Sequence, residues 1–468
     1  MNKPSLEQAT KVFFDLEIEH KMLDWKIGGI QVWPIFRFEL FRTFLRDTGV
    51  FEYSAGTFES TPLRRANKIK VFRYAAKLLL SPRLFNLFSP IFGKSRVALI
   101  PFYRRDDQGK DHLSSHIIDQ FGGNGFRIGS GPKDVYLPDQ IHRKELNTLF
   151  AKVYGPFAKL WIRSYLKPAE IKKYSTFVAE LERRMKFTLT SRNKFPVEQF
   201  RQVVAQSWGY RDLFKLENVA TVFVVDAIHL SVVRGAKLAG CRFVELQHGS
   251  IYPQHPSHNW PSGAIVQLAP DEFFYWGPYW IEGIRFASNT KPILVGAIPD
   301  MANLQVKAKK SIPNQVLFIS SYDVTERLFS QAVELAEKRK DLSILYKGHP
   351  REDLSKQAEY LRKTPTLGNL SIIESKATAI DLISESEYVV GVNSTALFEA
   401  AALGKKVVVI EIPGWEISKG LITRGDAALV GSKSELASEL SNVKACKNES
   451  FYYAKPISLN TAKYLSRP

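Results

Sequence analysis

The sequence predicts an α/β protein with two doubly wound, Rossmann-like domains that face each other across a cleft, preceded by a helical N-terminal extension. After residue 96, and again after residue 291, short runs of β-branched and aromatic residues alternate with longer helical patterns. The 468 residues exceed one ordinary core and suggest two or three domains. The 45% hydrophobic and 24% charged residues are typical of a folded globular protein.

Residues 1–95 are predicted to form a helical, basic N-terminal extension. Apolar and aromatic residues recur at helical spacing in residues 13–25 and again in residues 33–45. The pair Gly28-Gly29 and then Pro34 break this pattern into at least two helices. Aromatic stripes of this kind are more typical of a protein core than of a ligand site.

The formal net charge of +18 indicates an anionic partner, and the basic residues are unevenly spread. Between Glu59 and Asp106 there is no acidic residue, and apolar residues are interleaved with Arg64, Arg65, Lys68, Lys70, Arg73, Lys77, Arg83, Lys94, Arg96, Arg104 and Arg105. Such a segment can lie in the headgroup layer of an anionic membrane, or it can be a helix packed on its own domain with a solvated basic face. Nucleic acid is not expected as a partner, because no nucleic-acid-binding motif accompanies the charge.

Cysteine usage and the N-terminus indicate the cell compartment. The chain has two cysteines, Cys241 and Cys446, which favour neither a disulfide framework nor a cysteine metal site. The N-terminus lacks the basic region and apolar core of a signal peptide, and no apolar run reaches the roughly 18 residues that span a bilayer. A cytoplasmic protein is therefore expected.

Residues 96–290 are predicted to be the first α/β domain. Strands are expected at residues 97–103, 221–226 and 242–247, and a helix at residues 230–238 makes the last two a parallel crossover unit. The glycine-rich stretch 122–131 neither follows a strand nor opens a helix. We therefore expect a flexible loop there, and not a dinucleotide-binding turn.

Residues 291–450 are predicted to be the second α/β domain, and residues 451–468 a C-terminal tail. A short strand and turn is expected at residues 292–300, strands at 315–320, 343–346, 370–373, 388–392 and 406–410, and helices at 326–338, 378–384 and 395–403. Ligands of such sheets usually bind beyond the carboxyl ends of the strands, here in the cleft between the two domains.

A candidate phosphate site follows the strand at residues 343–346. Lys347, His349 and Arg351 place two cations and an imidazole at the carboxyl end of this strand. Such groups donate hydrogen bonds to phosphate oxygens and can offset the charge of a departing nucleotide. The simpler interpretation of His349 alone is a histidine that caps a loop.

A second polar loop follows the strand at residues 388–392. Ser394 and Thr395 open the next helix, so their hydroxyls and the backbone N–H groups should face the same cleft. Glu399 lies about one and a half turns further on, where its carboxylate could reach ribose hydroxyls or could simply be solvated. The two loops together predict a transferase that uses a nucleotide-activated donor.

The other wall of the cleft offers two candidate catalytic residues at strand ends. His248 precedes Gly249, where a substrate can approach the backbone, and an imidazole with a pKa of about 6.5 could take a proton from an acceptor hydroxyl. Asp226 is a second candidate base or nucleophile, or else a helix cap. His255 and His258 suggest a metal site, but no set of carboxylates accompanies them, so no metal is expected.

These residues resemble motifs of the two-domain GT-B glycosyltransferase superfamily. The similar branch contains the bacterial sialyl-, polysialyl- and Kdo-transferases and the CDP-glycerol-type polyol-phosphate polymerases, whose His-Pro motif and Ser/Thr pair bind the phosphates of a cytidine nucleotide. Lys347-Gly-His-Pro-Arg351 and Ser394-Thr395 are similar to these motifs, and Gln247-His-Gly-Ser250 is similar to a His-Gly motif that supplies a base in the polymerases. The motifs span roughly residues 220–410, and the acidic base motif of sialyltransferases is absent.

The resemblance implies a metal-independent glycosyltransferase that moves a sugar from a CMP- or CDP-linked donor, with no other cofactor, to a growing cell-surface glycan or lipid-linked acceptor. The residues assigned are catalytic His248, Asp226 and His349, and donor-binding Lys347, His349, Arg351, Ser394, Thr395 and Glu399. The alternatives are a polyol-phosphate transferase of the CDP-glycerol glycerophosphotransferase type, a nucleotide-sugar 2-epimerase-like enzyme, and a non-catalytic membrane-associated assembly protein. The basic segment would hold the protein on the inner face of the cell membrane.

Overall fold

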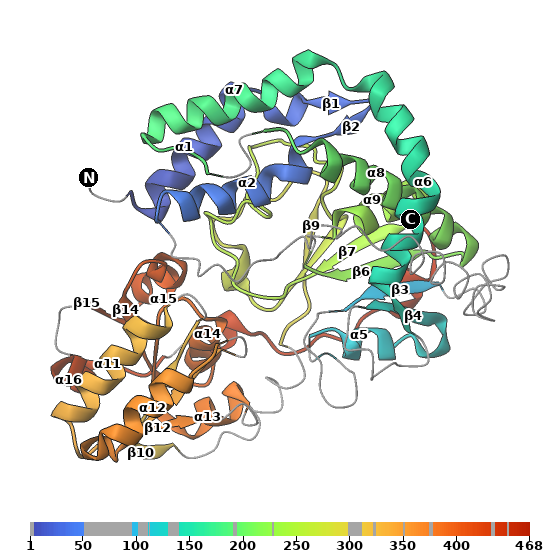
Figure 1. The fold of residues 1–468 in the computed structure, drawn as a ribbon. Helices are drawn as coiled ribbons and strands as arrows, with labels where there is room; N and C mark the ends of the chain where they lie inside the picture. Colours follow the sequence, from blue (N-terminus) through green and yellow to red (C-terminus); the bar gives the residue numbers. More distant parts are fainter. Residues whose placement is uncertain are drawn as a thin grey trace.

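In the computed structural model the chain folds into two α/β domains, each built on one parallel sheet (Figure 1). The structure describes residues 4–50, 96–101, 111, 113–129, 140–190, 194–226, 229–297, 311–321, 324–349, 352–373, 378–431, 436–446 and 449–468. Most of the basic segment at residues 64–105 therefore lies outside the described residues.

The sheet of the first domain has, within the described ranges, seven parallel strands in the order β5-β4-β3-β6-β7-β8-β9. They are β3 (Val97–Ile100), β4 (Gly125–Gly129), β5 (Gln140–His142), β6 (Thr221–Val225), β7 (Arg242–Leu246), β8 (Glu272–Tyr275) and β9 (Lys291–Leu294). Ala98 and Ile100 of β3 face one core cluster, and Val97 and Leu99 face another. Both faces are thus covered, as is usual for parallel sheets.

The sheet of the second domain has six parallel strands in the described part of the chain, in the order β12-β11-β10-β13-β14-β15. They are β10 (Ile312–Ile319), β11 (Ser343–Lys347), β12 (Leu370–Ile373), β13 (Ser386–Gly391), β14 (Lys406–Glu411) and β15 (Ala428–Gly431). The helices are α11 (Thr325–Lys338), α12 (Ser355–Lys363), α13 (Ala379–Glu385), α14 (Thr395–Ala402), α15 (Lys419–Thr423) and α16 (Leu436–Glu439). The strand order is that of the Rossmann fold, so the predicted fold class is confirmed.

Helices of the first domain share one large core with one face of its sheet (Figure 1). They are α1 (Leu6–Glu19), α2 (Trp33–Asp47), α6 (Arg143–Tyr165), α7 (Pro168–Met185), α8 (Val197–Leu216) and α9 (Leu230–Ala239). On the other face α5 (Ser115–Asp119) packs against β3 through Ile117 and Ile118. No helix in the described part of the chain is long and apolar enough to cross a membrane.

The helices predicted for the first 50 residues are present and belong to the core of the first domain. Phe13 of α1 stacks on Trp33 of α2, with ring centroids 5.8 Å apart, and meets Phe177 of α7 edge-on at 5.4 Å. A small hairpin of β1 (Lys26–Ile27) and β2 (Ile30–Gln31) separates the two helices. These helices therefore pack as part of the first domain, beside its sheet.

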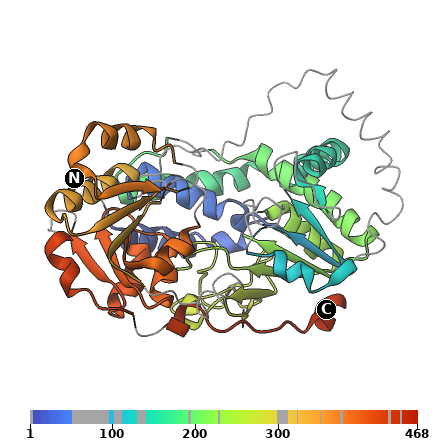
Figure 2. The same cartoon turned by 90° about the horizontal axis from the view of Figure 1, so that it is seen from below.

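The last residues run back from the second domain along the first (Figure 2). Ala454 N donates to Trp276 O at 2.9 Å, and Ile457 N donates to Val295 O at 2.9 Å. The short helix α17 (Glu449–Tyr452), against α14, precedes these points, and α18 (Thr461–Leu465), which reaches the start of β6, follows them. The segment predicted as a tail thus links the two domains.

Two local predictions are wrong. Residues 291–294, expected to open the second domain, form strand β9, which pairs in parallel with β8 of the first sheet, because the chain turns back after β8. The glycine-rich stretch, expected to be a loop, forms a 3-10 turn and then the buried strand β4 in its described part, residues 122–129. A Cβ at Gly125 would lie 2.5 Å from Ile118 Cδ1, so the glycine lets α5 pack closely on β4.

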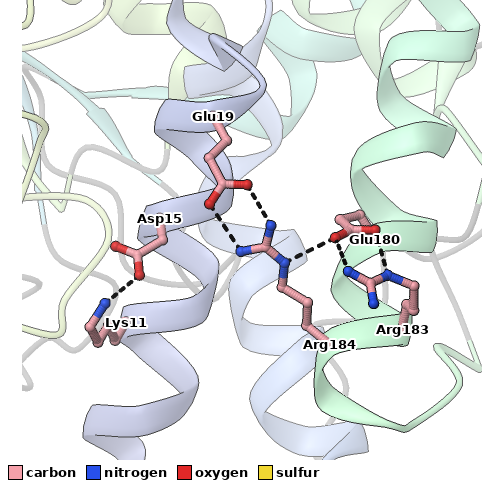
Figure 3. A network of polar contacts seen from close by, with 6 residues as sticks. All are labelled: Lys11, Asp15, Glu19, Glu180, Arg183 and Arg184. Atoms are coloured by element: carbon pink, nitrogen blue, oxygen red, sulfur yellow. Dashed lines mark hydrogen bonds and ion pairs between the residues drawn. The ribbon is translucent and has the colours of Figure 1, made fainter.

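An exposed network of charged residues joins α1 to α7 (Figure 3). Arg184 Nη1 donates to Glu19 Oε1 and Arg184 Nε to Glu180 Oε1, both at 3.0 Å. Arg183 also donates to Glu180, and these hydrogen bonds, first from Arg183 and then from Arg184, lower the pKa of Glu180 to about 2.

Replacing Arg184 by alanine should change the free energy of unfolding very little. The network stays in contact with water, which screens the attraction between its charges. Urea unfolding at low and high salt should show a small difference from the wild type that salt removes. A loss as large as that from a core substitution such as Phe13→Ala would contradict this expectation.

Candidate active site

The predicted donor residues lie at the carboxyl end of the second sheet, around its central strand β10. Strands β11 and β13 are the two neighbours of β10, so the loops that follow them flank its end. Ser321, just after β10, hydrogen-bonds to Asn393, just before Ser394, and ties two of these strand ends together. Because β10 and β13 form the topological switch point of this sheet, this edge is where a ligand is expected to bind.

Lys347 is a buried cation that lacks a counter-charge. It is the last residue of β11 and is 8% exposed. Burial lowers the pKa of its ammonium group. In the described part of the chain, burial is the one cause of this shift, and no charged residue contributes to it. A buried lysine without an anionic partner is a strong candidate to receive a phosphate.

The loop that carries His349 is held by Glu352, which sequence reasoning missed. Glu352 Oε2 accepts from His349 N at 2.8 Å, and Glu352 Oε1 accepts from the hydroxyls of Ser320 and Thr325, each at 2.7 Å. Gly348 leaves room for this carboxylate, because a Cβ there would lie 3.0 Å from Glu352 Oε2. The structure places His349 beside the end of β10, while Arg351 lies outside the described residues.

Ser394 and Thr395 open helix α14 as the sequence predicts. Ser394 is the N-cap, and its Oγ accepts from Ala396 N at 3.3 Å. Both residues are partly exposed, so the hydroxyls and the first N–H groups of the helix are accessible to a ligand. The capping interpretation and the ligand-binding one therefore hold together for Ser394.

Glu399 is a partly exposed residue of α14 whose carboxyl group has no charged partner among the described residues. Burial raises its pKa to about 7. Glu399 also raises the pKa of the buried Tyr453 hydroxyl, after burial itself, so the two groups lie near each other. The Tyr453 hydroxyl forms no hydrogen bond in the part of the chain that the structure describes. Glu399 is thus the accessible member of this pair, and the Tyr453 hydroxyl lies buried behind it.

Replacing Glu399 by glutamine should stabilise the protein at about pH 8 and have little effect near pH 4. In the unfolded chain this carboxyl ionises near its ordinary pKa of 4.5, whereas in the folded chain it keeps its proton up to about pH 7. The wild type should therefore lose stability between these two values, and the glutamine variant should not. Urea unfolding of both proteins over this pH range tests the sign of their stability difference. A cation near Glu399 would reverse that sign.

On the first sheet, the predicted catalytic residues Asp226 and His248 lie next to each other. They follow the adjacent strands β6 and β7, and His248 Nε2 lies 3.7 Å from Asp226 Oδ2. Asp226 has a φ of 66°, a left-handed conformation that aspartate tolerates better than most residues and that is frequent at functional sites. The carboxylate can therefore stabilise a protonated His248 during proton transfer.

Two further residues complete this cluster, Arg143 at the start of α6 and His229 just before α9. Arg143 contacts His229 Nε2. Burial, followed by the charges of Arg143 and His248, lowers the pKa of His229 well below its usual value, so its ring is neutral. Burial also lowers the pKa of Arg143, and Asp226 opposes that change. No sequence motif marks Arg143. It lies 86 positions before His229 in the sequence, and the fold brings the two residues together.

The turn after β7 is fixed by the side chain of Gln247. Its Nε2 donates to Gly249 O at 3.0 Å, and its Oε1 accepts from Trp276 N at 3.0 Å. The backbone N–H of Gln247 donates to Phe274 O, also at 3.0 Å. These hydrogen bonds fix the backbone on both sides of His248 at the end of the sheet.

A buried chain of titratable residues lies further along the same loop. His258 Nε2 is 3.0 Å from Glu245 Oε1, and His258 Nδ1 is 3.2 Å from His255 Nδ1. Burial, then the charges of His258 and His248, lower the pKa of His255 well below its usual value. In the described residues there is no group of three or more His, Cys, Asp or Glu side chains that could hold a metal ion.

The N-terminal helices support the loop that follows His248. Arg37 of α2 forms an ion pair with Glu17 of α1, with 2.7 Å between Nε and Oε1 and both side chains only 1% exposed. Arg37 also donates to Pro256 O and, at 2.9 Å, to Asn259 O, and its guanidinium lies 4.2 Å from the Trp260 ring. The first 50 residues thus support the loop that follows His248, a predicted catalytic residue.

The two half-sites meet. A Cβ at Gly249 would lie 4.0 Å from Thr395 Cγ2, which places the turn after His248 against the start of α14. The predicted acceptor-side and donor-side residues are therefore brought together across the two domains, as a reaction between two bound substrates requires.

The sequence of the second domain is similar to a known family. Residues 302–410 match the family model described as alpha-2,8-polysialyltransferase (POLYST). The matched range contains Lys347, His349, Ser394, Thr395 and Glu399. No curated protein sequence matches the chain.

Several solved structures are similar to about three quarters of the chain at low identity. Acinetobacter baumannii MurG shares 10% identity with a TM-score of 0.41, covering 74% of this chain and 88% of its own. The UDP-GlcNAc 2-epimerase from Neisseria meningitidis bound to UDP-GlcNAc shares 14% with a TM-score of 0.44, covering 77% and 96%. Staphylococcus aureus MnaA with UDP shares 13% with a TM-score of 0.43, covering 77% and 90%. The two-domain fold and the family match together support a glycosyltransferase of polysaccharide synthesis.

Proposed function

We propose that the protein is a GT-B glycosyltransferase that moves a sugar from a CMP- or CDP-linked donor to a growing cell-surface glycan, such as a capsule or an O-antigen. The proposal rests chiefly on one observation, the closeness of Gly249 to Thr395, since a Cβ at Gly249 would lie 4.0 Å from Thr395 Cγ2. The turn after His248 in one domain thus lies near the start of α14 in the other. The His248–Asp226 pair suits an acceptor hydroxyl, and Lys347 with the start of α14 suits a donor phosphate.

In the proposed reaction, His248 takes the proton of an acceptor hydroxyl, and the carboxylate of Asp226 stabilises the imidazolium that forms. The acceptor oxygen bonds to the anomeric carbon of the donor while the bond from that carbon to the phosphate oxygen breaks. Lys347, His349 and the N–H groups at Ser394–Thr395 receive the negative charge of the departing nucleotide. Glu399 contacts the ribose, and Arg351 is a further donor residue of the same loop.

The reaction as proposed does not need a metal ion, because the Lys347 ammonium and the start of α14 provide the positive charge at the phosphate. We place the protein in the cytoplasm, as a peripheral protein on the inner face of the cell membrane. Its substrates there are the nucleotide-sugar donor and a glycan or lipid-linked acceptor.

Incubation of the purified protein with cytidine-linked donors, with and without an acceptor, tests this function. A glycosyltransferase releases nucleotide when acceptor is present and adds to the acceptor a sugar without phosphate. Addition of a group that contains phosphate would instead identify a polyol-phosphate transferase, the alternative suggested by Gln247-His-Gly-Ser250. An altered donor in the absence of acceptor would identify an epimerase.

Two single variants test the alternative that the protein is a non-catalytic assembly protein. His349→Ala and Ser394→Ala should each weaken donor binding and lower polysaccharide production in cells. If both variants bind donor and support polysaccharide production like the wild type, the enzyme proposal is wrong.

A further inference from the structure

Helix α6 carries an apolar stripe that faces solvent. Phe157 and Leu160 are 65% and 66% exposed, and Val153 is 49% exposed. These three residues lie four and three positions apart, so they share one face of the helix. α6 lies at the periphery of the first domain (Figure 2). Large apolar side chains clustered on an outer surface usually mark an interaction site.

The fold does not need this outer stripe, because α6 already has a buried face. Phe150, Ala158 and Ile162 of the same helix are buried in the core of the first domain. Gly209 of α8 lets Phe150 approach so closely that a Cβ there would lie 2.1 Å from the ring. The inner face therefore attaches the helix, and the outer face is left for another partner.

The stripe is flanked by positive charge. Lys152, Lys159 and Arg163 are exposed and, at spacings of seven and four residues, lie along one side of the apolar face. Lys167 follows at the start of α7, and no acidic residue occurs from residue 146 to residue 169. A helix with exposed apolar residues beside cations of a single sign matches an anionic lipid surface, in which apolar side chains enter the headgroup layer and cations meet phosphates.

We propose that the outer face of α6, formed by Lys152, Val153, Phe157, Lys159, Leu160 and Arg163, docks on an anionic membrane. This surface belongs to the described first domain and is distinct from the basic segment at residues 64–105. The positive charge favours a lipid partner over a protein partner. A protein groove would have to surround its apolar centre with acidic residues that meet all of these cations at once.

Helix α6 begins beside the predicted acceptor side of the site. Its first residue, Arg143, contacts His229, and the charge of Asp226 acts on the pKa of Arg143. Phe157 is fourteen residues further on, about 21 Å along the helix axis. If the proposed function is correct, one helix joins the acceptor side of the site to the membrane that holds a lipid-linked acceptor.

Sedimentation with vesicles tests the docking surface. The full chain should bind vesicles of phosphatidylcholine with phosphatidylglycerol and bind pure phosphatidylcholine weakly. The double variant F157S/L160S should bind the anionic vesicles about tenfold less tightly or worse. The triple variant K152Q/K159Q/R163Q should lose affinity and part of its salt dependence, and the basic segment at residues 64–105 retains the rest. Ile265→Ser, at a residue 70% exposed in the loop between β7 and β8, is the matched control and should bind like the wild type.

Equal vesicle binding by F157S/L160S and the wild type, with unchanged circular dichroism, would overturn the proposal. So would equal wild-type binding to neutral and anionic vesicles. A wild-type dimer that becomes a monomer in F157S/L160S, measured by light scattering, would show that a second copy of the chain covers this face. Transfer to a soluble acceptor should be unaffected by F157S/L160S. Vesicle binding by a protein that transfers no sugar would refute the proposed function and leave this surface standing.

Discussion

Alanine in place of His248 should lower kcat for transfer by about 10²–10⁴-fold and leave the donor Kd nearly unchanged. The imidazole is the group next to Asp226, at 3.7 Å, that can take the acceptor proton. The residues assigned to the donor phosphate belong to the other domain and keep their positions. Initial rates at saturating donor and acceptor, together with calorimetric titration of the donor, measure the two quantities separately.

The matched control for this prediction is His20→Gln, at the end of α1, which should keep full activity. Asp226→Asn should also slow the reaction, because it removes the negative charge that stabilises the imidazolium. A His248→Ala variant that turns over at the wild-type rate would show that His248 is not the base. A variant that loses donor affinity but not kcat would place His248 in donor binding instead.

Alanine in place of Arg37 should lower the free energy of unfolding by about 3–5 kcal/mol. The change leaves the carboxylate of Glu17 buried without its cation and removes the donors to Pro256 O and Asn259 O. Urea unfolding followed by fluorescence measures the effect. Because the same loop carries His248 at its start, any folded fraction of the variant should also show a reduced kcat.

Two controls separate the buried pair from ordinary surface charge. Arg184→Ala removes an exposed arginine and should cost far less. The double variant Glu17→Gln with Arg37→Ala should be more stable than the two single losses predict, because no lone charge is left buried. If Arg37→Ala unfolds at the same urea concentration as the wild type, the N-terminal helices do not support the loop.

Much of the fold follows from the sequence because parallel strands are buried on both faces. Strands β6, β7 and β13 are short runs that end within one residue of the expected positions, and the predicted site residues Asp226, His248 and Ser394 follow them. Strand β9 was assigned to the wrong sheet, since a short apolar run does not reveal which sheet it joins. The pattern determines strands better than it determines their partners.

The missed site residues share one physical cause. Arg143 reaches His229 across 86 positions of sequence, and Arg37 reaches Pro256 across 219. Glu352 acts through hydrogen bonds to a backbone N–H and two hydroxyls, which no residue pattern announces. Strand ends predict which residues face a cleft, whereas the residues that position them come from tertiary packing.

A crystal structure of the protein with a bound cytidine nucleotide tests whether this edge of the second sheet is the donor site. A phosphate oxygen should lie within hydrogen-bond distance of Lys347 Nζ, and another should be bound by Ser394 Oγ or the first N–H groups of α14. Glu399 should then face the ribose, and the leaving oxygen should point toward His248. A nucleotide bound elsewhere, with Lys347 still unpaired, would contradict the assignment of this edge as the donor site.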